Sequence, residues 1–232
     1  MSRVWNVVRI QLVNAPMVIG NPLLVLAIAF ATNLAIFGVI SDTAEPGSMV
    51  TGAIMSIYIT LLVSHIITMT QIFTFALGLS VTRRTFYAAT SVLIVGQAIG
   101  YGILMYLMLL LERATGGWGM DLKFFGVPFM VNDNPLLQFL IYTVPFLFMS
   151  FIGVYVGIVF KRWGQPGVYA LTIGTGAVAA ILGILATWQQ WWPAVGRFFA
   201  DQSPMSLFAG YPFVLAVILA GIGFLTLRRA TP

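Results

Sequence analysis

Polar side chains with a capacity for chemistry gather within one long apolar stretch of the chain, residues 52–80. Thr60, Ser64, Thr68 and Gln71 are spaced four, four and three positions apart, so they share one face of a helix. His65 lies beside that face. Polar groups at membrane depth must pair with a neighbouring helix or face water. The hydroxyl groups suit hydrogen bonds between helices, whereas the histidine and the glutamine suit a solvated pathway equally well. The candidate pathway residues are Thr60, Ser64, His65, Thr68 and Gln71.

Most catalytic chemistry is disfavoured by what the sequence lacks. It has no cysteine and a single histidine, His65, which argues against thiolate and histidine-based metal sites. It has neither a G-x-x-x-x-G-K-[ST] phosphate loop nor a G-x-S-x-G element. We therefore expect no enzyme activity, cofactor or metal on this chain. An enzyme centred on His65 would lack an acid or a second histidine within the apolar stretches.

The elements that must position these residues are membrane-spanning helices. The chain has 232 residues, of which 60% are hydrophobic and only 7% charged, a surface too apolar for a soluble domain. A spanning helix needs about 20 mostly apolar residues. We predict an all-α integral membrane protein whose residues 1–232 form a single transmembrane domain. Its expected spans are about 22–41, 52–80, 91–111, 135–160, 168–187 and 207–227. The breaks between them carry turn residues, among them Glu45-Pro46-Gly47 and Gln165-Pro166-Gly167. Pro145 should kink the fourth span or leave a backbone carbonyl unpaired.

The few charges are sorted by sign along this pattern. Arg3 and Arg9, then the pairs 83–84, 161–162 and 228–229, form four purely basic groups. All six acidic residues fall in the segments between these groups. Since short cytoplasmic loops accumulate Lys and Arg, we predict six spans with both chain ends in the cytoplasm. The net charge of +5 then reflects contact with anionic lipid and not with nucleic acid.

Two further segments have recognisable patterns. Residues 3–14 place apolar and basic side chains on different sides of a helix, which favours a helix lying in the cytoplasmic interface. In the fifth expected span, small residues form a ridge that lets helices approach closely in lipid. This ridge suits packing within one subunit, a subunit interface or a smooth pathway wall. Its residues are Thr172, Gly176, Ala179, Gly183 and Thr187.

The arrangement resembles the ABC-2 type permease subunits of bacterial ABC exporters. The resemblance rests on the N-terminal interfacial helix, six spans, aromatic segments before the last span, and above all the segment GLSVTRRTFY, residues 78–87. In that family a short cytoplasmic element after the second span docks on a separate ATPase. The resemblance implies that the matching coupling residues here are Thr82, Arg83, Arg84, Phe86 and Tyr87. Alternatively, the two arginines are topology signals only.

The resemblance also implies partners and a location. It implies a multi-pass subunit of the bacterial plasma membrane that works as a homo- or heterodimer with separate ABC ATPase subunits, which bind ATP and Mg. The expected function is export of an amphipathic substrate such as a lipid, peptide, antibiotic or drug. A membrane scaffold or assembly factor without transport activity would explain the hydropathy equally well, but this alternative assigns no role to Arg83 and Arg84.

Overall fold

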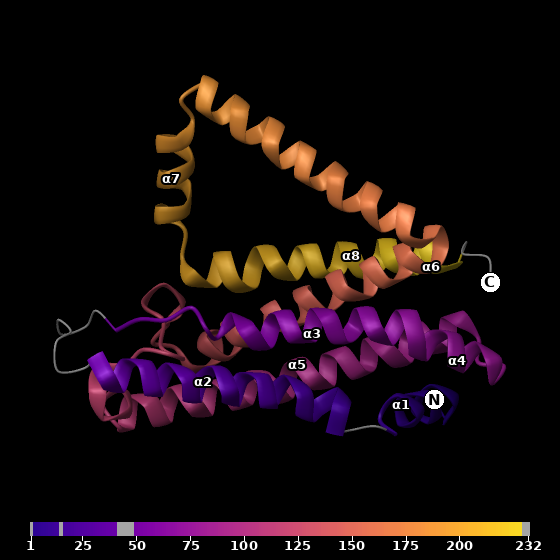
Figure 1. Ribbon diagram of the computed structural model, residues 1–232, viewed down its shortest axis with the longest axis horizontal. Helices are drawn as coiled ribbons and strands as arrows, with labels where there is room; N and C mark the ends of the chain where they lie inside the picture. Colours follow the sequence, from indigo (N-terminus) through magenta and orange to yellow (C-terminus); the bar gives the residue numbers. More distant parts are fainter. Residues whose placement is uncertain (1, 14–15, 41–48, 229–232) are drawn as a thin grey trace.

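The computed structural model describes residues 2–13, 16–40 and 49–228 (Figure 1). Within these ranges every regular element is helical, and the one strand-like contact is an isolated bridge between Val50 and Lys123. The expected all-helical class is therefore confirmed. The predicted turn at Glu45-Pro46-Gly47 lies outside the described residues.

Five helices of the described chain are long and apolar enough to cross a membrane, which is compatible with a multi-pass membrane protein. The first is α2 (Asn21–Ile40), extended at its start by the π-helical η1 (Pro16–Gly20). The second is the run of α3 (Met55–Ile67), η2 (Thr68–Ile72) and α4 (Phe73–Gly78). The others are α5 (Arg83–Ala114), α6 (Pro135–Trp188), and η5 (Ser206–Gly210) with α8 (Tyr211–Arg228).

Two expected boundaries need correction. Helix α5 begins at Arg83, eight residues before the expected start at residue 91, because Thr82 caps it immediately after a tight turn. The expected spans 135–160 and 168–187 are parts of one helix, α6, of 54 residues. At a rise of 1.5 Å per residue this helix is about 80 Å long, more than twice the hydrocarbon thickness of a bilayer.

Helix α6 bends at Gly164. The backbone there has a φ of 66° and a ψ of −159°, a conformation essentially restricted to glycine. Pro166 falls in the first turn after the bend, where its missing N–H costs no hydrogen bond. The break thus lies next to the expected turn at residues 165–167. Pro145, which was expected to kink the helix or to leave a backbone carbonyl unpaired, leaves the helical backbone angles intact.

The bundle core has two parts. Toward the end opposite the termini, α2, α3, α5 and the first half of α6 pack with the loop 118–130 around Tyr58, Phe124, Phe125 and Tyr142. Toward the other end, α1 (Ser2–Gln11), η2, α4, α5, α6 and α8 enclose a second cluster that includes Phe86. The outer loop carries two short helices, η3 (Gly117–Asp121) and η4 (Pro128–Met130).

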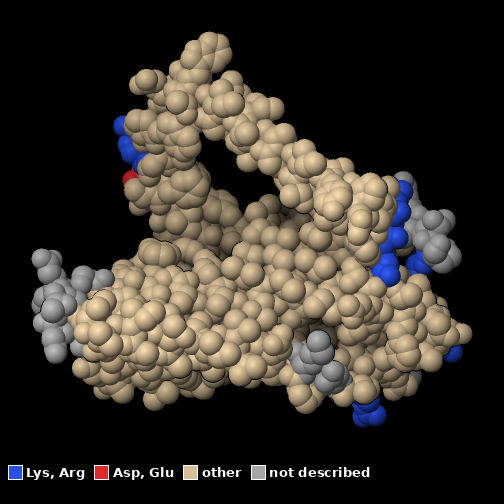
Figure 2. Space-filling model, in the orientation of Figure 1, with Lys and Arg blue, Asp and Glu red and all other residues tan. Residues whose placement is uncertain are grey.

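The second half of α6 stands away from this bundle. Together with α7 (Trp192–Asp201) and α8 it outlines a triangle in Figure 1, and Figure 2 shows an opening through it. Between residues 165 and 188 only Ala186 is buried, and α7 has no buried residue. This arm therefore exposes an apolar helix on nearly all sides.

Candidate functional site

The polar face formed by Thr60, Ser64, Thr68 and Gln71, which we call the seam, runs along α3 and η2, and its hydroxyl groups bond to their own helix. Thr60 Oγ1 donates to the Ser56 carbonyl at 2.7 Å, Ser64 Oγ to the Thr60 carbonyl at 2.8 Å, and Thr68 Oγ1 to the Ser64 carbonyl at 3.0 Å. Among the described residues, these hydroxyl groups donate no hydrogen bond to another helix, contrary to the expectation. Hydroxyls that bond back in this way tend to bend a helix, and the π-helical η2 begins at Thr68.

The seam opens on a cavity of about 640 Å³, which we call the α1 cavity. It lies between α1 and η1 on one side and the α3–η2–α4 helix on the other. Three of the five predicted pathway residues line it, namely Ser64, Thr68 and Gln71, whereas Thr60 and His65 do not. The complete lining is Ile10, Gln11, Val13, Val18, Ser64, Ile67, Thr68, Gln71, Ile72, Phe75 and Leu79.

His65 faces the interior of the bundle. Its side chain is 2% exposed, and Gly153 of α6 approaches so closely that an added Cβ would lie 3.2 Å from the Cβ of His65. Neither ring nitrogen has a hydrogen-bond partner among the described residues, although Gln97 of α5 is a neighbour. Seam residues and His65 thus face different surroundings, because successive helical positions are turned by about 100°.

Gln11 is a polar wall residue that sequence reasoning missed. Its side chain is 2% exposed, and its Nε2 donates to Thr90 Oγ1 of α5 at 3.0 Å, which ties α1 to the bundle. Its Oε1 has no partner among the described residues. The only sequence signal was a glutamine within the amphipathic segment 3–14, which gave no reason to expect burial.

The predicted coupling residues divide into two groups. Thr82 Oγ1 caps α5 by accepting from the Thr85 N–H at 3.2 Å, and Arg84 is exposed in the first turn. Phe86 and Tyr87 point inward and are buried. They hold α5 in place: the Phe86 ring lies 5.1 Å from that of Phe73, and the Tyr87 hydroxyl donates to the Ala220 carbonyl at 2.7 Å.

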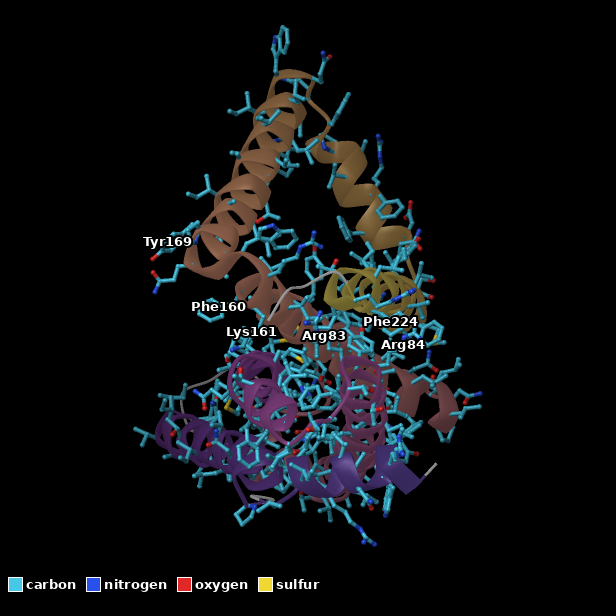
Figure 3. The ribbon with its side chains drawn as sticks, turned by 90° about the vertical axis from the view of Figure 1, so that its right-hand side faces the viewer. Arg83, Arg84, Phe160, Lys161, Tyr169 and Phe224 are labelled. Atoms are coloured by element: carbon cyan, nitrogen blue, oxygen red, sulfur yellow. The ribbon has the colours of Figure 1, made fainter. Side chains whose placement is uncertain are left out.

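The basic groups of the described chain gather in space as well as in sequence. Figure 2 shows Lys and Arg side chains at the end of the molecule where α8 ends, and one further basic side chain on α7, which contains Arg197. Figure 3 views this end directly, with Arg83, Arg84 and Lys161 together around the start of α5 and the middle of α6. Lys161 Nζ also donates to Thr74 Oγ1 at 2.6 Å, joining α6 to α4.

The small-residue ridge of α6 is exposed. Thr172, Gly176, Ala179 and Thr187 are exposed and Gly183 is half-buried. A Cβ added at Gly176 or Gly183 would meet no atom within 4 Å. The ridge therefore does not bring another helix of the described chain close, which leaves the subunit interface and the pathway wall as its alternative uses.

A buried carboxylate that the sequence did not single out organises the outer loop. Glu112 is 4% exposed at the end of α5. Its oxygens accept from the backbone N–H groups of Phe124 (2.9 Å), Phe125 (2.8 Å) and Gly126 (2.7 Å) and from the indole Nε1 of Trp118 (3.1 Å). Four donors offset the cost of burying the charge, so its role is structural.

Comparison of the chain with family models, curated proteins and solved structures found no match. Among the described residues no three His, Cys, Asp or Glu side chains group so as to hold a metal ion. A functional argument must therefore rest on features of this structure and not on related proteins. These features are the basic end around Arg83, Arg84 and Lys161, the exposed second half of α6, and the α1 cavity.

Proposed function

We propose that this chain is the membrane-spanning permease subunit of an ATP-driven exporter, of the kind that the ABC-2 permeases represent. The observation that carries the proposal is the position of Arg83 and Arg84. They begin a long apolar helix directly after another one ends, at the same end of the molecule as Lys161. A rigid, positively charged turn of this kind suits transmission of force from a partner protein.

The proposed topology has six spans with both chain ends in the cytoplasm of a bacterium. The bend at Gly164 supports this count, because it divides the 54-residue α6 into two parts, each long enough to cross a bilayer. The grouping of basic residues at one end supports the orientation, since cytoplasmic loops are rich in Lys and Arg. Helix α1 would then lie in the cytoplasmic interface, with Arg9 in its last turn.

The proposed assembly contains two permease chains and two ATPase subunits, and the ATPase subunits hold ATP and Mg. Arg84 and the capped turn at Thr82 form the contact surface on this chain. Phe86 and Tyr87 serve as anchors below it, because both are buried. The exposed ridge of α6 supports a second membrane subunit, either a copy of this chain or a similar one. The transported substrate is amphipathic, in keeping with spanning helices whose one acidic residue, Glu112, lies in the last turn of α5.

Purification under mild conditions tests the proposal. The chain is expressed with a tag in a bacterial host of its own kind, solubilised gently and isolated. We expect an ATPase to accompany it, with ATP hydrolysis stimulated by amphipathic compounds. If no ATP-hydrolysing subunit associates with the chain, the exporter proposal fails and the scaffold alternative takes its place.

Charge reversal discriminates between these two functions. The double variant Arg83→Glu/Arg84→Glu places like charges against an acidic partner groove, which costs several kcal/mol. We expect ATPase association to weaken at least about tenfold. The matched double variant Lys161→Glu/Arg162→Glu reverses the same number of charges on α6 and should retain association. Equal association by all three proteins would favour the scaffold.

A further inference from the structure

A second hollow of the described chain, which we call the α5 groove, runs along the surface of α5. Its floor extends from Val92 to Leu104, so at a rise of 1.5 Å per residue it is about 18 Å long. That length is close to the depth of one leaflet, because the hydrocarbon core of a bilayer is about 30 Å thick. The walls come from α1, η1 and α2, through Trp5, Val8, Leu12, Ile19 and Leu23.

Two glycines give the groove its depth. Gly96 and Gly100 lie one turn apart in the floor, and a Cβ added at either would meet no atom within 4 Å. The groove has a volume of about 460 Å³, whereas a helix of the same length and a diameter of 10 Å would fill about 1,400 Å³. The groove therefore suits a single hydrocarbon chain better than a helix.

Hydrogen bonds between floor and wall fix the shape of the groove. Gln97 Nε2 donates to the Val18 carbonyl at 3.1 Å, and the Tyr101 hydroxyl donates to the Ile19 carbonyl at 3.0 Å, which ties η1 to α5. Both of these polar side chains are buried, and no Asp or Glu lines the groove. A hydrocarbon chain would thus meet a preformed apolar surface, so binding orders little of the protein.

Two hydrogen-bond donors lie at the α1 end of the groove. Trp5 lines the groove and is 55% exposed, and Arg9 is exposed four positions later on the same side of α1. Neither side chain has a hydrogen-bond or ion-pair partner among the described residues. An indole and a guanidinium can only donate, so together they suit a group rich in acceptors, such as a phosphate. The charge of Arg9 adds attraction for a lipid with a net negative charge.

We propose that the α5 groove holds one acyl chain of an anionic phospholipid whose phosphate accepts hydrogen bonds from Trp5 and Arg9. The lipid belongs to the leaflet on the α1 side of the membrane. This inference rests on the proposed function only in placing the chain in a membrane with α1 at its interface. It concerns the isolated chain, so it can fail or succeed whether or not an ATPase associates with the protein.

The test uses the full chain in phosphatidylcholine nanodiscs. The probe is a phosphatidylglycerol with a photoactivatable diazirine in its acyl chain, and mass spectrometry locates the labelled residues. We expect labelling within residues 5–12 or 92–104 that unlabelled phosphatidylglycerol displaces. A phosphatidylcholine probe with the same acyl chain, at equal mole fraction, should label these residues about fivefold less. Equal labelling by the two probes would overturn the proposal.

Charge variants on α1 connect this preference to one arginine. Arg9→Gln should remove most of the preference for phosphatidylglycerol while labelling of residues 92–104 continues, because the apolar groove is intact. Arg3→Gln removes the same charge from the same helix, but Arg3 is turned by about 200° from Trp5, so this variant should retain the preference. An equal loss in both variants, or no loss in Arg9→Gln, would contradict the assignment of Arg9.

A variant that fills the groove tests the position of the acyl chain. Gly100→Leu should lower labelling of residues 92–104 by both probes at least about fivefold, because its side chain occupies the space of the lipid. Gly174→Leu adds the same side chain on the exposed half of α6 and should leave labelling unchanged. If Gly100→Leu does not fold, Gly96→Leu fills the same groove one turn away.

The remaining outcomes separate the lipid from other occupants. Undiminished labelling of residues 92–104 in Gly100→Leu would show that the probe lies outside the groove, and the proposal would be wrong. If the parent protein is not labelled there and Gly100→Leu instead weakens a dimer of this chain, a second copy fills the groove and the proposal is equally wrong.

Discussion

Glu112 shows how one residue fixes a loop that hydropathy leaves undefined. The loop after α5 turns back through Gly116, Gly117 and Gly119, all of which have positive φ. This turn aims the N–H groups of residues 124–126 at a single carboxylate, and it brings Trp118 against Phe30 with ring centroids 4.7 Å apart. The carboxylate thus joins the end of α5 to the aromatic cluster beneath the outer loop.

We predict that Glu112→Gln lowers the stability of the protein by about 2–3 kcal/mol, since hydrogen bonds to a charged group contribute about 1.5–3 kcal/mol and the new NH2 would face N–H donors. Hydrogen exchange should accelerate at the amides of residues 124–126. Asp133→Asn is the matched control, because Asp133 is exposed. Unchanged exchange at these amides would show that the carboxylate does not hold the loop.

The sequence predicted residues at this scale only where spacing carried the information. The spacing of Ser64, Thr68 and Gln71 placed them on one face, and all three line the α1 cavity. The negative charge of Glu112 placed it in a segment outside the basic groups, but the sequence did not predict its burial. Its partners are mainly backbone N–H groups, and glycine conformations in the loop bring them together. Gln11 was missed for a related reason, since its burial depends on how α1 packs against Thr90.

At the scale of the elements, the bend of α6 decides how the chain is divided. Turn residues at 165–167 predicted a break between two spans, and the backbone stays helical on both sides of Gly164 without a loop. Hydropathy alone could not distinguish a bend from a loop, because residues 161–167 are polar enough to end a span whether or not their backbone stays helical. The early start of α5 was missed for the same reason, since its first turn contains the polar residues 83–85 and Thr82 caps it.

We predict that Gly164→Ala destabilises this bend by about 1–3 kcal/mol, because an alanine rarely adopts the Gly164 backbone angles. Spin labels at Phe160→Cys and Leu182→Cys report the change, and a straight helix would separate these positions by about 33 Å. The measured distance should shift toward that value. Gly174→Ala on the same helix is the control, because its Cβ would meet nothing within 4 Å. A distance and melting temperature equal to those of the parent would refute this role.

Close packing of α6 on the α3–η2 helix leads to a second prediction at this scale. A Cβ at Gly157 would lie 2.5 Å from the Cβ of Met69, which leaves no space for a side chain. We expect Gly157→Leu to lower stability by about 1–3 kcal/mol, as overpacking does. Gly176→Leu adds the same volume to the exposed half of α6 and should leave the stability of the single chain unchanged. Thermal unfolding in detergent compares the two, and equal melting temperatures would contradict the prediction.

At the scale of the whole molecule, the chain has a packed half and an arm. The bundle of α2, α3, α5 and the first half of α6 has its own core, whereas residues 165–188 contain one buried residue, Ala186. Lipid alone can cover an apolar helix, but it gives no reason for a ridge of small residues. Helices that approach closely in membranes use such ridges, which is the physical argument for a second subunit.

Disulfide cross-linking tests whether that subunit is a copy of this chain. The sequence contains no cysteine, so a single substitution gives an unambiguous result. We predict that Ala179→Cys on the ridge forms a covalent dimer in native membranes under mild oxidation. Ile184→Cys, which is 67% exposed on the same helix but outside the ridge, should cross-link far less.

Adding Gly176→Leu to Ala179→Cys should reduce cross-linking about fivefold or more, because the bulky side chain prevents close approach of the helices. Equal cross-linking at both cysteine positions would indicate random collision, and none at Ala179→Cys would exclude a homodimer through this ridge.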